Sequence, residues 1–485
     1  MILVGDYFCV NFQIFMNISD IKKQQKVHFV GLGGIGMSAL AFILRKWNVA
    51  VQGSDLKENY LTPKLKEVGV QYFVGHDEKN IDESVSLLVQ TSIIKTTNPE
   101  ILKAQELQIP IITRAQLLAI IMQDYKGITI AGTHGKTSTT GMVAMMLESN
   151  NFDPTVINGG IIHHFQSNSK IGKGEYLVAE SDESDASFIA LPSFIGAVTN
   201  IEPEHLEFAG YGGDFEKQKA CFEKYITQIP AQGLCVLCLD SPEVEKIYNK
   251  LISSHKNLIS YSIKKSADIV AKNIFVSIDG ISFDIHFKNG EIIAGVKMPI
   301  YGEHNASNAL VAVAIAKYFN FGAEQIKKGL ASFTGVKQRF TKVGSYNGVT
   351  IIDDYGHHPT EIKATLKGAR NLVKNNKLIC VFQPHKYTRV RDLFNEFCHA
   401  FEYADCVIVT DIYSASQAPI DGITQDYLIE GIKKTGHPKV IKLNHENDLA
   451  SVLKNEINQG DMVLCTGAGT ISSWAYKLEE QLKKL

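Results

Sequence analysis

Short apolar runs alternate with amphipathic segments along most of this chain. In its first part, strand-like runs lie at 27–30, 49–53, 87–90 and 110–113, and helix-like stretches at 37–46, 99–107 and 115–122. Strands that alternate with helices of this length are typical of parallel βαβ units. The pattern therefore predicts a doubly wound α/β sheet that begins near residue 26.

The same alternation continues in two further segments. Strand-like runs lie at 127–131, 176–179, 195–199 and 233–239 in the second segment, and at 378–382, 407–410 and 462–465 in the third. The stretch 267–299 predicts a small antiparallel appendage, and Asn347-Gly348 predicts a hairpin turn. We therefore expect an α/β fold with an N-terminal extension at 1–25 and three Rossmann-like domains at 26–125, 126–335 and 336–485.

The sequence GTHGKTS at 132–138 follows an apolar strand and precedes a predicted helix at 138–147. Glycines at such a turn let the backbone approach a phosphate, and the N–H groups of the helix start point at the anion. Lys136 can reach the terminal phosphates, and the hydroxyl of Thr137 can hold Mg²⁺. Only two residues separate Gly132 from Gly135, where the common phosphate loop has four. We expect a nucleoside triphosphate and Mg²⁺ here, in a central domain of phosphate-loop ATPase type.

A second glycine-rich turn, GLGGIG at 31–36, follows the first strand, and Asp55 lies about 20 residues further on. Taken alone, this turn indicates a dinucleotide site. It is equally consistent with another diphosphate or ribose group at a helix N-terminus, such as a UDP-sugar.

Polar residues follow several predicted strands. An acidic run at 180–185 follows one strand of the second segment, and His205 comes soon after another. In open parallel sheets, ligands lie beyond the carboxyl ends of the strands, so these groups should meet the phosphate loop. Glu180 and His205 are metal-ligand candidates, although Mg²⁺ prefers oxygen to imidazole. A solvated acidic loop and a capping histidine are the alternatives.

In the third segment, polar residues fill 355–361 and 385–389. The second of these runs combines His385, Lys386 and Arg389, which suits a carboxylate ligand such as that of an amino acid. A solvated basic loop is the alternative.

Composition narrows the function classes. The formal net charge of −2 over 485 residues gives no overall basic field for nucleic acid. No stretch is long and apolar enough to predict a membrane span, and the N-terminal residues lack the basic start of a signal peptide. Eight cysteines are scattered, and the pair Cys235 and Cys238 lies in a strand-like run, which predicts core packing rather than zinc binding. We expect a cytoplasmic protein.

Taken together, the motifs resemble those of the Mur ligase family of peptidoglycan synthesis. The matching segments, in order, are 31–41, 132–140, 180–188, 199–205, 302–308, 353–361 and 383–393. The resemblance implies that ATP phosphorylates the lactyl carboxylate of UDP-N-acetylmuramate, and that the amine of L-alanine attacks the acyl phosphate. It displaces the dinucleotide interpretation of the first turn in favour of the UDP-sugar.

The resemblance also implies roles for individual residues. Those expected to take part in catalysis are Lys136, Glu180, His205, His358 and Arg389. Those expected to contact ATP are Gly132, Thr133, His134, Gly135, Lys136, Thr137, Ser138, Asn305, Arg339 and Asp354. Those expected to contact the sugar nucleotide or alanine are Gly33, Ser38, Asp55, Ser92, Arg114, Tyr355, His385 and Lys386. The expected Mg²⁺ ligands are Thr137, Glu180 and His205.

Other hypotheses remain open at this point. A family member that attaches a preformed tripeptide would share these motifs. A nicotinamide-dependent oxidoreductase would leave the phosphate loop unexplained, and a nucleotide-gated binding protein would not need Glu180 or His205. Lys386 and Glu204 stand where relatives commonly carry Arg and Asp. We expect small-molecule substrates only, and a monomer or weak homodimer.

Overall fold

The computed structural model describes residues 16–91, 94–184, 186–204, 206, 210–277, 280–415 and 417–485. Ser92, His205 and residues 1–15 of the expected extension lie outside this part of the chain. Within it, the strands form three sheets, and the chain divides into two compact units. The first unit contains 1–273, 283–298 and 306–334, and the second contains 274–282, 299–305 and 335–485.

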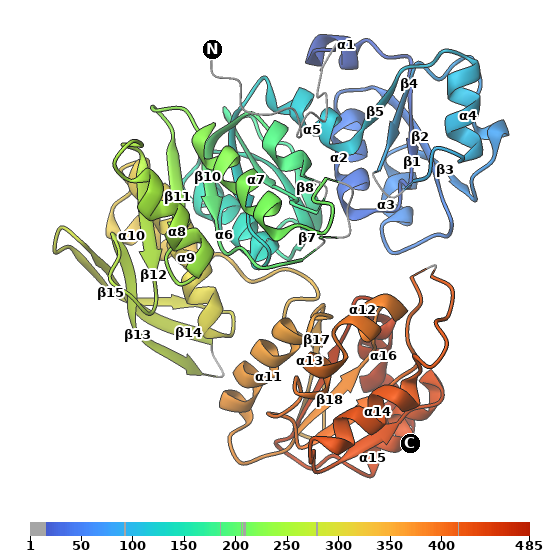
Figure 1. Ribbon diagram of the computed structural model, residues 1–485, viewed down its shortest axis with the longest axis vertical. Coiled ribbons are helices and arrows are strands. Elements are labelled where there is room, and N and C mark those ends of the chain that lie inside the picture. The colour runs from blue at the N-terminus through green and yellow to red at the C-terminus, as the bar shows by residue number, and fades with distance from the viewer. Residues whose placement is uncertain are drawn as a thin grey trace. The chain divides into compact units, whose positions relative to one another are not determined.

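The first sheet has the strand order β3-β2-β1-β4-β5, and all its strands are parallel. Its strands are β1 (Lys26–Val30), β2 (Ala50–Asp55), β3 (Gln71–Val74), β4 (Leu87–Gln90) and β5 (Ile111–Thr113). The helices of this segment are α1 (Ile18–Lys22), α2 (Ile35–Lys46), α3 (Thr62–Glu67), η1 (Glu78–Asn80), α4 (Pro99–Glu106) and α5 (Arg114–Met122). Phe29 packs with the core under α2, whereas Val30 packs with that under α4, so these helices cover opposite faces (Figure 1).

The second sheet has ten strands, in the order β15-β14-β13-β12-β11-β10-β6-β9-β7-β8. They are β6 (Lys126–Ala131), β7 (Thr155–Ile162), β8 (Ser167–Lys170), β9 (Tyr176–Glu180), β10 (Ser193–Val198), β11 (Leu234–Cys238), β12 (Leu258–Ser262), β13 (Ile269–Ser277), β14 (Gly280–Phe287) and β15 (Ile292–Met298). The helices are α6 (Lys136–Glu148), η2 (Ser187–Ala190), α7 (Phe215–Thr227), α8 (Pro242–Leu251), α9 (Glu303–Tyr318) and α10 (Ala323–Ala331). The stretch predicted as a small appendage thus continues the main sheet.

These two sheets share one hydrophobic cluster. Leu40 of α2 and Leu118 of α5 belong to it together with Ile157 of β7 and Leu177 of β9. Ile21 of α1 also packs there, so the last part of the expected N-terminal extension joins this core. We retain domains at 26–125 and 126–335 as a proposal, because each segment forms its own sheet.

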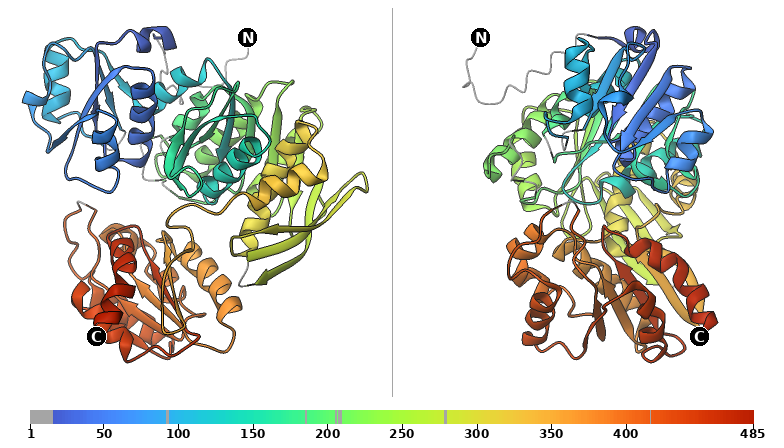
Figure 2. Two further views of the ribbon diagram at one scale, coloured as in Figure 1. Left: turned by 180° about the vertical axis from the view of Figure 1, so that it is seen from behind. Right: turned by 90° about the vertical axis from the view of Figure 1, so that its right-hand side faces the viewer.

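The third sheet has the order β16-β17-β21-β18-β19-β20. Its strands are β16 (Thr341–Tyr346), β17 (Val349–Asp354), β18 (Leu378–Phe382), β19 (Cys406–Val409), β20 (Val440–Lys442) and β21 (Met462–Thr466). The helices are α11 (Pro359–Val373), α12 (Tyr387–Asp392), α13 (Phe394–Cys398), α14 (Gln425–Lys434), η3 (Glu446–Asp448), α15 (Leu449–Lys454) and α16 (Ile471–Lys484). This segment is drawn orange to red in Figure 2.

Alternating side chains explain why helices cover both faces of the third sheet. Cys380 packs with α11 and α14, whereas its neighbour Ile379 packs with α15 and α16. Strands β16 and β17 pair antiparallel, and the turn residues Asn347 and Gly348 have φ of 45° and 81°. This confirms the predicted hairpin and the mixed α/β fold.

Two expectations about composition can be compared with the structure. Cys235 and Cys238 are buried in β11, and burial raises the pKa of the Cys235 thiol to about 12, which confirms them as core residues. No helix in the described part of the chain combines the length and apolarity that a bilayer span needs.

Candidate active site

The phosphate loop joins β6 to α6. Gly132 and Gly135 have φ of +130° and +83°, which L side chains rarely adopt. A Cβ at Gly132 would collide with Oγ1 of Thr199, and a Cβ at Gly135 would lie 2.8 Å from Oδ1 of Asn308. Gly135 forms the left-handed N-cap of α6, so the helix begins at Lys136, two residues earlier than the sequence pattern predicted.

The residues after β10 hold the loop in shape. The His134 N–H donates to Oδ1 of Asn200 at 2.7 Å, and the Thr199 hydroxyl donates to the His134 carbonyl at 2.6 Å. The Glu202 N–H donates to Oγ1 of Thr133 at 2.9 Å. Thr133 and His134, the two residues between the glycines of this short loop, are therefore hydrogen-bonded to the segment that follows β10.

We expect Gly132→Ala to damage this loop selectively. The substituent would strain a positive-φ position by about 1–3 kcal/mol and would also collide with Thr199. Nucleotide binding should be lost, together with part of the free energy of unfolding. The matched control is Gly290→Ala, since Gly290 has φ of +90° but no atom within 4 Å of its Cβ position. Equal ATP affinity of the two variants in calorimetry would contradict this account.

The Lys136 ammonium lies against the loop. Its Nζ donates to the carbonyls of Gly132 at 2.7 Å and Thr133 at 3.0 Å, and it lies 2.7 Å from Oε2 of Glu183. Burial favours the neutral amine, but the carboxylates of Glu183, Glu180 and Asp182 outweigh it and raise the pKa of Lys136. The lysine is thus held charged at the start of a helix.

Glu183 was not selected from the sequence. It follows β9 in the acidic run, and its side chain is only 1% exposed. Burial raises the pKa of Glu183 to about 7, although Lys136 opposes the shift. The only sequence signal for it was the placement of an acidic run directly after a buried strand.

Two of the three expected metal ligands lie in the described part of the chain. Strands β6 and β9 pair in parallel, with Ile130 opposite Glu180, so Glu180 ends its strand beside the phosphate loop. Its Oε2 accepts the Gly159 N–H at 2.8 Å. Among the described residues, no group of three His, Cys, Asp or Glu is placed to hold a metal ion. The hydroxyl of Thr137 and the carboxylate of Glu180 are nevertheless oxygen donors of the kind that Mg²⁺ takes.

Asn308 is a further residue that sequence reasoning did not select. It lies on α9, and its amide oxygen is the atom that a Cβ at Gly135 would meet. Asn305 is on the same helix, and its Nδ2 donates to the Tyr301 carbonyl at 2.7 Å. The signal for Asn308 in the sequence was its place as a polar residue within the expected motif at 302–308.

The glycine-rich turn after β1 is held by its neighbours. The Gly33 N–H donates to Oδ2 of Asp55 at 2.9 Å, and Asn59 Nδ2 donates to the Gly33 carbonyl at 2.8 Å. Ser38 is buried, and its hydroxyl donates to the Ile35 carbonyl at 2.9 Å. Its expected contact with a substrate stays a prediction.

Arg114, at the start of α5, connects the two sheets of the first unit. Its Nη2 lies 3.4 Å from Oδ2 of Asp182, in the acidic run after β9. The structure therefore brings a residue expected at the sugar nucleotide next to the run that contains Glu180 and Glu183.

In the second unit, Asp354 ends β17 and is buried. Its carboxylate accepts the N–H groups of Phe340 and Gly356, both at 2.9 Å. Burial raises the pKa of Asp354, although Arg339 opposes the shift. The Arg339 guanidinium lies 5.2 Å from the centre of the Tyr355 ring. Three of the expected contact residues thus lie around one strand end.

A second polar group lies at the start of α12. Nη1 of Arg389 is 3.2 Å from Nδ1 of His385, and the His385 ring stacks on Tyr413 at 5.5 Å between centroids. Burial, together with Arg389 and Lys386, lowers the pKa of His385 to about 4. A neutral imidazole beside two cations leaves net positive charge, which suits a carboxylate ligand.

His358 is the N-cap of α11. Its Nδ1 accepts the Thr360 N–H at 3.4 Å, and Oε2 of Glu361 accepts the His358 N–H at 3.2 Å. In the neutral ring this assigns the proton to Nε2. In this tautomer Nε2 is a donor and cannot take a proton from the amine, so the expected part of His358 in catalysis stays a prediction.

Stability should fall in acid because of the neighbouring His357. Burial lowers the pKa of His357 to about 3, although Glu361 opposes this, whereas the unfolded chain has an ordinary histidine. Between about pH 6.5 and 3 the unfolded chain binds the extra proton, so the free energy of unfolding drops by about 1.4 kcal/mol per pH unit. Urea titrations at pH 7 and pH 5 should show a smaller drop for His357→Asn, and equal drops would contradict the assignment.

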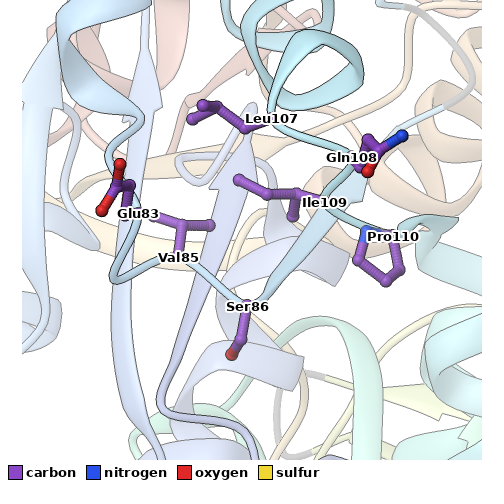
Figure 3. Close-up of a pocket in the computed structure, with 7 residues that line it drawn as sticks. All are labelled: Glu83, Val85, Ser86, Leu107, Gln108, Ile109 and Pro110. Atoms are coloured by element: carbon purple, nitrogen blue, oxygen red, sulfur yellow. The ribbon is translucent and has the colours of Figure 1, made fainter.

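A hollow of 370 Å³ lies elsewhere on the first sheet (Figure 3). It is lined by Glu83, Val85, Ser86, Leu107, Gln108, Ile109 and Pro110. These residues precede β4 and β5, at the edge opposite the glycine-rich turn. Ligands of parallel sheets bind beyond the carboxyl ends, so we do not assign the hollow to the site.

Comparison with known proteins identifies the family. Three family models match in order: the Mur ligase family catalytic domain at 26–126, the Mur ligase middle domain at 130–316 and the Mur ligase glutamate ligase domain at 338–469. UDP-N-acetylmuramate–L-alanine ligase of Phenylobacterium zucineum is 43% identical over 463 residues, which are 95% of this chain and 96% of the relative. The chain belongs to the Mur ligase family. The enzyme of the same name from Bradyrhizobium diazoefficiens is 44% identical over 464 residues, or 95% of this chain and 98% of the relative.

Solved structures of Mur ligases show the same architecture. UDP-N-acetylmuramate-alanine ligase from Thermotoga maritima superposes with a TM-score of 0.82 at 27% identity, covering 95% of this chain and 99% of that one. A murein peptide ligase from Psychrobacter arcticus has a TM-score of 0.68 at 22% identity, with the same coverage, and is evidence for the fold alone. The predicted family and fold class are confirmed.

Proposed function

We propose that this chain joins L-alanine to the lactyl carboxylate of UDP-N-acetylmuramate, with conversion of ATP to ADP and phosphate. The observation that carries this proposal is the 43% identity, over 95% of the chain, to relatives of that name. The charged Lys136 at the start of α6 supports the ATP part independently. The product is a peptidoglycan precursor, and we place the reaction in the cytoplasm.

The reaction has two steps. In the first, an oxygen of the lactyl carboxylate attacks the γ-phosphorus of ATP, the bond to ADP breaks and an acyl phosphate forms. In the second, the neutral amine of L-alanine attacks the carbonyl carbon, and the tetrahedral intermediate expels phosphate, which leaves as hydrogen phosphate with the proton that the amine loses. Lys136 and the amides at the start of α6 stabilise the charge on the transferred phosphoryl group.

Thr137 and Glu180 would hold Mg²⁺, with His205 as the third ligand that the family resemblance implies. Bound there, the ion would neutralise phosphate oxygens during transfer. Glu180 is fixed for this task by the Gly159 N–H, which leaves its other carboxylate oxygen to a ligand.

The remaining residues divide between the substrates. We assign Gly33, Ser38, Asp55, Ser92 and Arg114 to the sugar nucleotide. We assign Asn305, Arg339 and Asp354 to ATP, and Tyr355, His385, Lys386 and Arg389 to the lactyl group and alanine. The cationic pair at 386 and 389 supports the last assignment, because ammonium and guanidinium groups bind carboxylates through charge-assisted hydrogen bonds.

The test is phosphate release from ATP and Mg²⁺ with UDP-N-acetylmuramate and a panel of amines. We expect release that requires both the sugar nucleotide and L-alanine, is weaker with glycine or L-serine, and stops when the metal is chelated. Release only with the preformed tripeptide would instead indicate a Mur ligase that attaches the preformed tripeptide. No release with any amine would favour a nucleotide-gated binding protein.

A further inference from the structure

A polar network is buried in the first unit, between the first sheet and α4. We call it the Glu100 network; its members are His28, Gln52, Ser54, His76, Asn80 and Glu100. Four of them, including Glu100, are at most 2% exposed. A charge buried in this way is costly unless donors surround it, so the arrangement needs an explanation beyond packing.

The Glu100 carboxylate is surrounded by donors. Its Oε1 accepts from Asn80 Nδ2 at 2.7 Å, and its Oε2 accepts from the Ser54 hydroxyl at 2.5 Å and from Nδ1 of His76 at 3.2 Å. Nε2 of His28 lies 3.5 Å from Oε2. Burial favours the neutral acid, but His28, Ser54 and Asn80 outweigh it and hold the pKa of Glu100 below its usual value. Glu100 is therefore charged at neutral pH.

This charge fixes the tautomer of His76. A carboxylate can only accept, so Nδ1 of His76 must carry the proton that points to Glu100. Nδ1 also lies 2.8 Å from the Ser54 hydroxyl, whose own proton goes to Glu100. In the neutral ring, Nε2 is then a hydrogen-bond acceptor. The His76 side chain is 13% exposed, so it stands at the border between the network and solvent.

The network also reaches the glycine-rich turn. The Ser54 carbonyl accepts the N–H groups of Gly31 and Leu32, both at 2.9 Å. The next residue, Asp55, accepts the Gly33 N–H, and its carbonyl accepts the N–H of Gly75, the residue before His76. The Ser54 side chain is thus hydrogen-bonded to Glu100, while the Ser54 backbone carbonyl holds the glycine-rich turn. Ser54 and the glycine-rich turn lie at the carboxyl edge of the first sheet, where ligands of parallel sheets bind.

We propose that Glu100 is a positioning residue for the sugar nucleotide: it orients His76 so that Nε2 accepts a hydrogen bond from the nucleoside, and it fixes the turn that faces the diphosphate. The ligand class is a nucleoside diphosphate with a hydroxyl or ring N–H donor. This inference rests on the proposed assignment of the sugar nucleotide to the first unit.

The test is binding of UDP, the probe, to the full chain by calorimetry, together with KM for each substrate. Glu100→Gln keeps the shape but removes the charge, and we expect UDP affinity to fall about tenfold, the value of one hydrogen bond to a charged or oriented group. KM for UDP-N-acetylmuramate should rise by the same factor, while KM for ATP stays unchanged. The matched control is Glu106→Gln on the same helix, because Glu106 is 67% exposed and pairs with Lys103.

A second variant covers the case in which Glu100→Gln does not fold. His76→Phe removes the Nε2 acceptor but leaves Asn80 and Ser54 on Glu100, and the same selective loss of UDP affinity is expected. Wild-type UDP affinity in either folded variant would overturn the proposal, as would an equal rise in KM for ATP, which indicates general damage. UDP binding without ligase activity in the wild type would count against the proposed function but not against this inference.

Discussion

Lys136→Ala is expected to lower turnover by at least about 10²-fold, the usual cost of removing one positioned charge-stabilising group. Lys136 is held charged by carboxylates and lies 2.7–3.0 Å from the loop carbonyls, at the start of α6, where we propose that the phosphates bind. Its loss should affect phosphoryl transfer more than binding, so kcat should fall further than KM for ATP rises. Steady-state kinetics with saturating sugar nucleotide and L-alanine would measure both.

The matched control is Lys264→Ala, because Lys264 is exposed in the same unit. Its turnover should equal that of the wild type. Thermal unfolding must show that the Lys136 variant stays folded, since Glu183 would then lack its cation. Near-normal turnover in folded Lys136→Ala would contradict the assignment of the loop at 132–138 to ATP.

Glu180→Gln is expected to raise the Mg²⁺ concentration for half-maximal rate by at least about tenfold. The amide keeps an oxygen for the Gly159 N–H, so the strand end should hold its position, while the charge that attracts a hard cation is lost. Turnover at saturating Mg²⁺ should also fall. Rates measured across a Mg²⁺ titration would separate the two effects.

Glu175→Gln provides the comparison for this variant. Glu175 pairs with Lys126 at 2.9 Å but is 60% exposed, so its charge lies at the surface of the same unit. It should leave the Mg²⁺ requirement unchanged. An unaltered requirement in Glu180→Gln as well would show that Glu180 does not bind the metal.

Local elements could be predicted from the sequence where the chemistry of a single residue determines the backbone conformation. The hairpin at Asn347-Gly348 is a case, because both positions need a positive φ. The α6 start was placed two residues late, and the structure shows that the left-handed N-cap at Gly135 sets it. The stretch 267–299 was predicted as an appendage because alternation shows a strand but not which sheet it joins.

The residues of the candidate site also divide into those that the sequence predicted and those that it did not. Arg389 and His385 were selected from the sequence as parts of one polar run, and they meet in the structure. Asn308 and Glu100 were missed because their partners are distant in sequence, and only the strand order and helix packing bring them together. Glu183 was expected near the phosphate loop only as part of the acidic run at 180–185, and the structure shows that it pairs with Lys136. The Glu100 network, for example, joins β1, β2 and α4, which no local pattern could connect.

The most direct test of the central claim uses UDP-N-acetylmuramate labelled with ¹⁸O in its lactyl carboxylate, incubated with ATP, Mg²⁺ and L-alanine. The acyl-phosphate route transfers one carboxylate oxygen to the phosphate that leaves, so mass spectrometry should find one ¹⁸O in each released phosphate. Phosphate without the label, or label in AMP, would contradict the account.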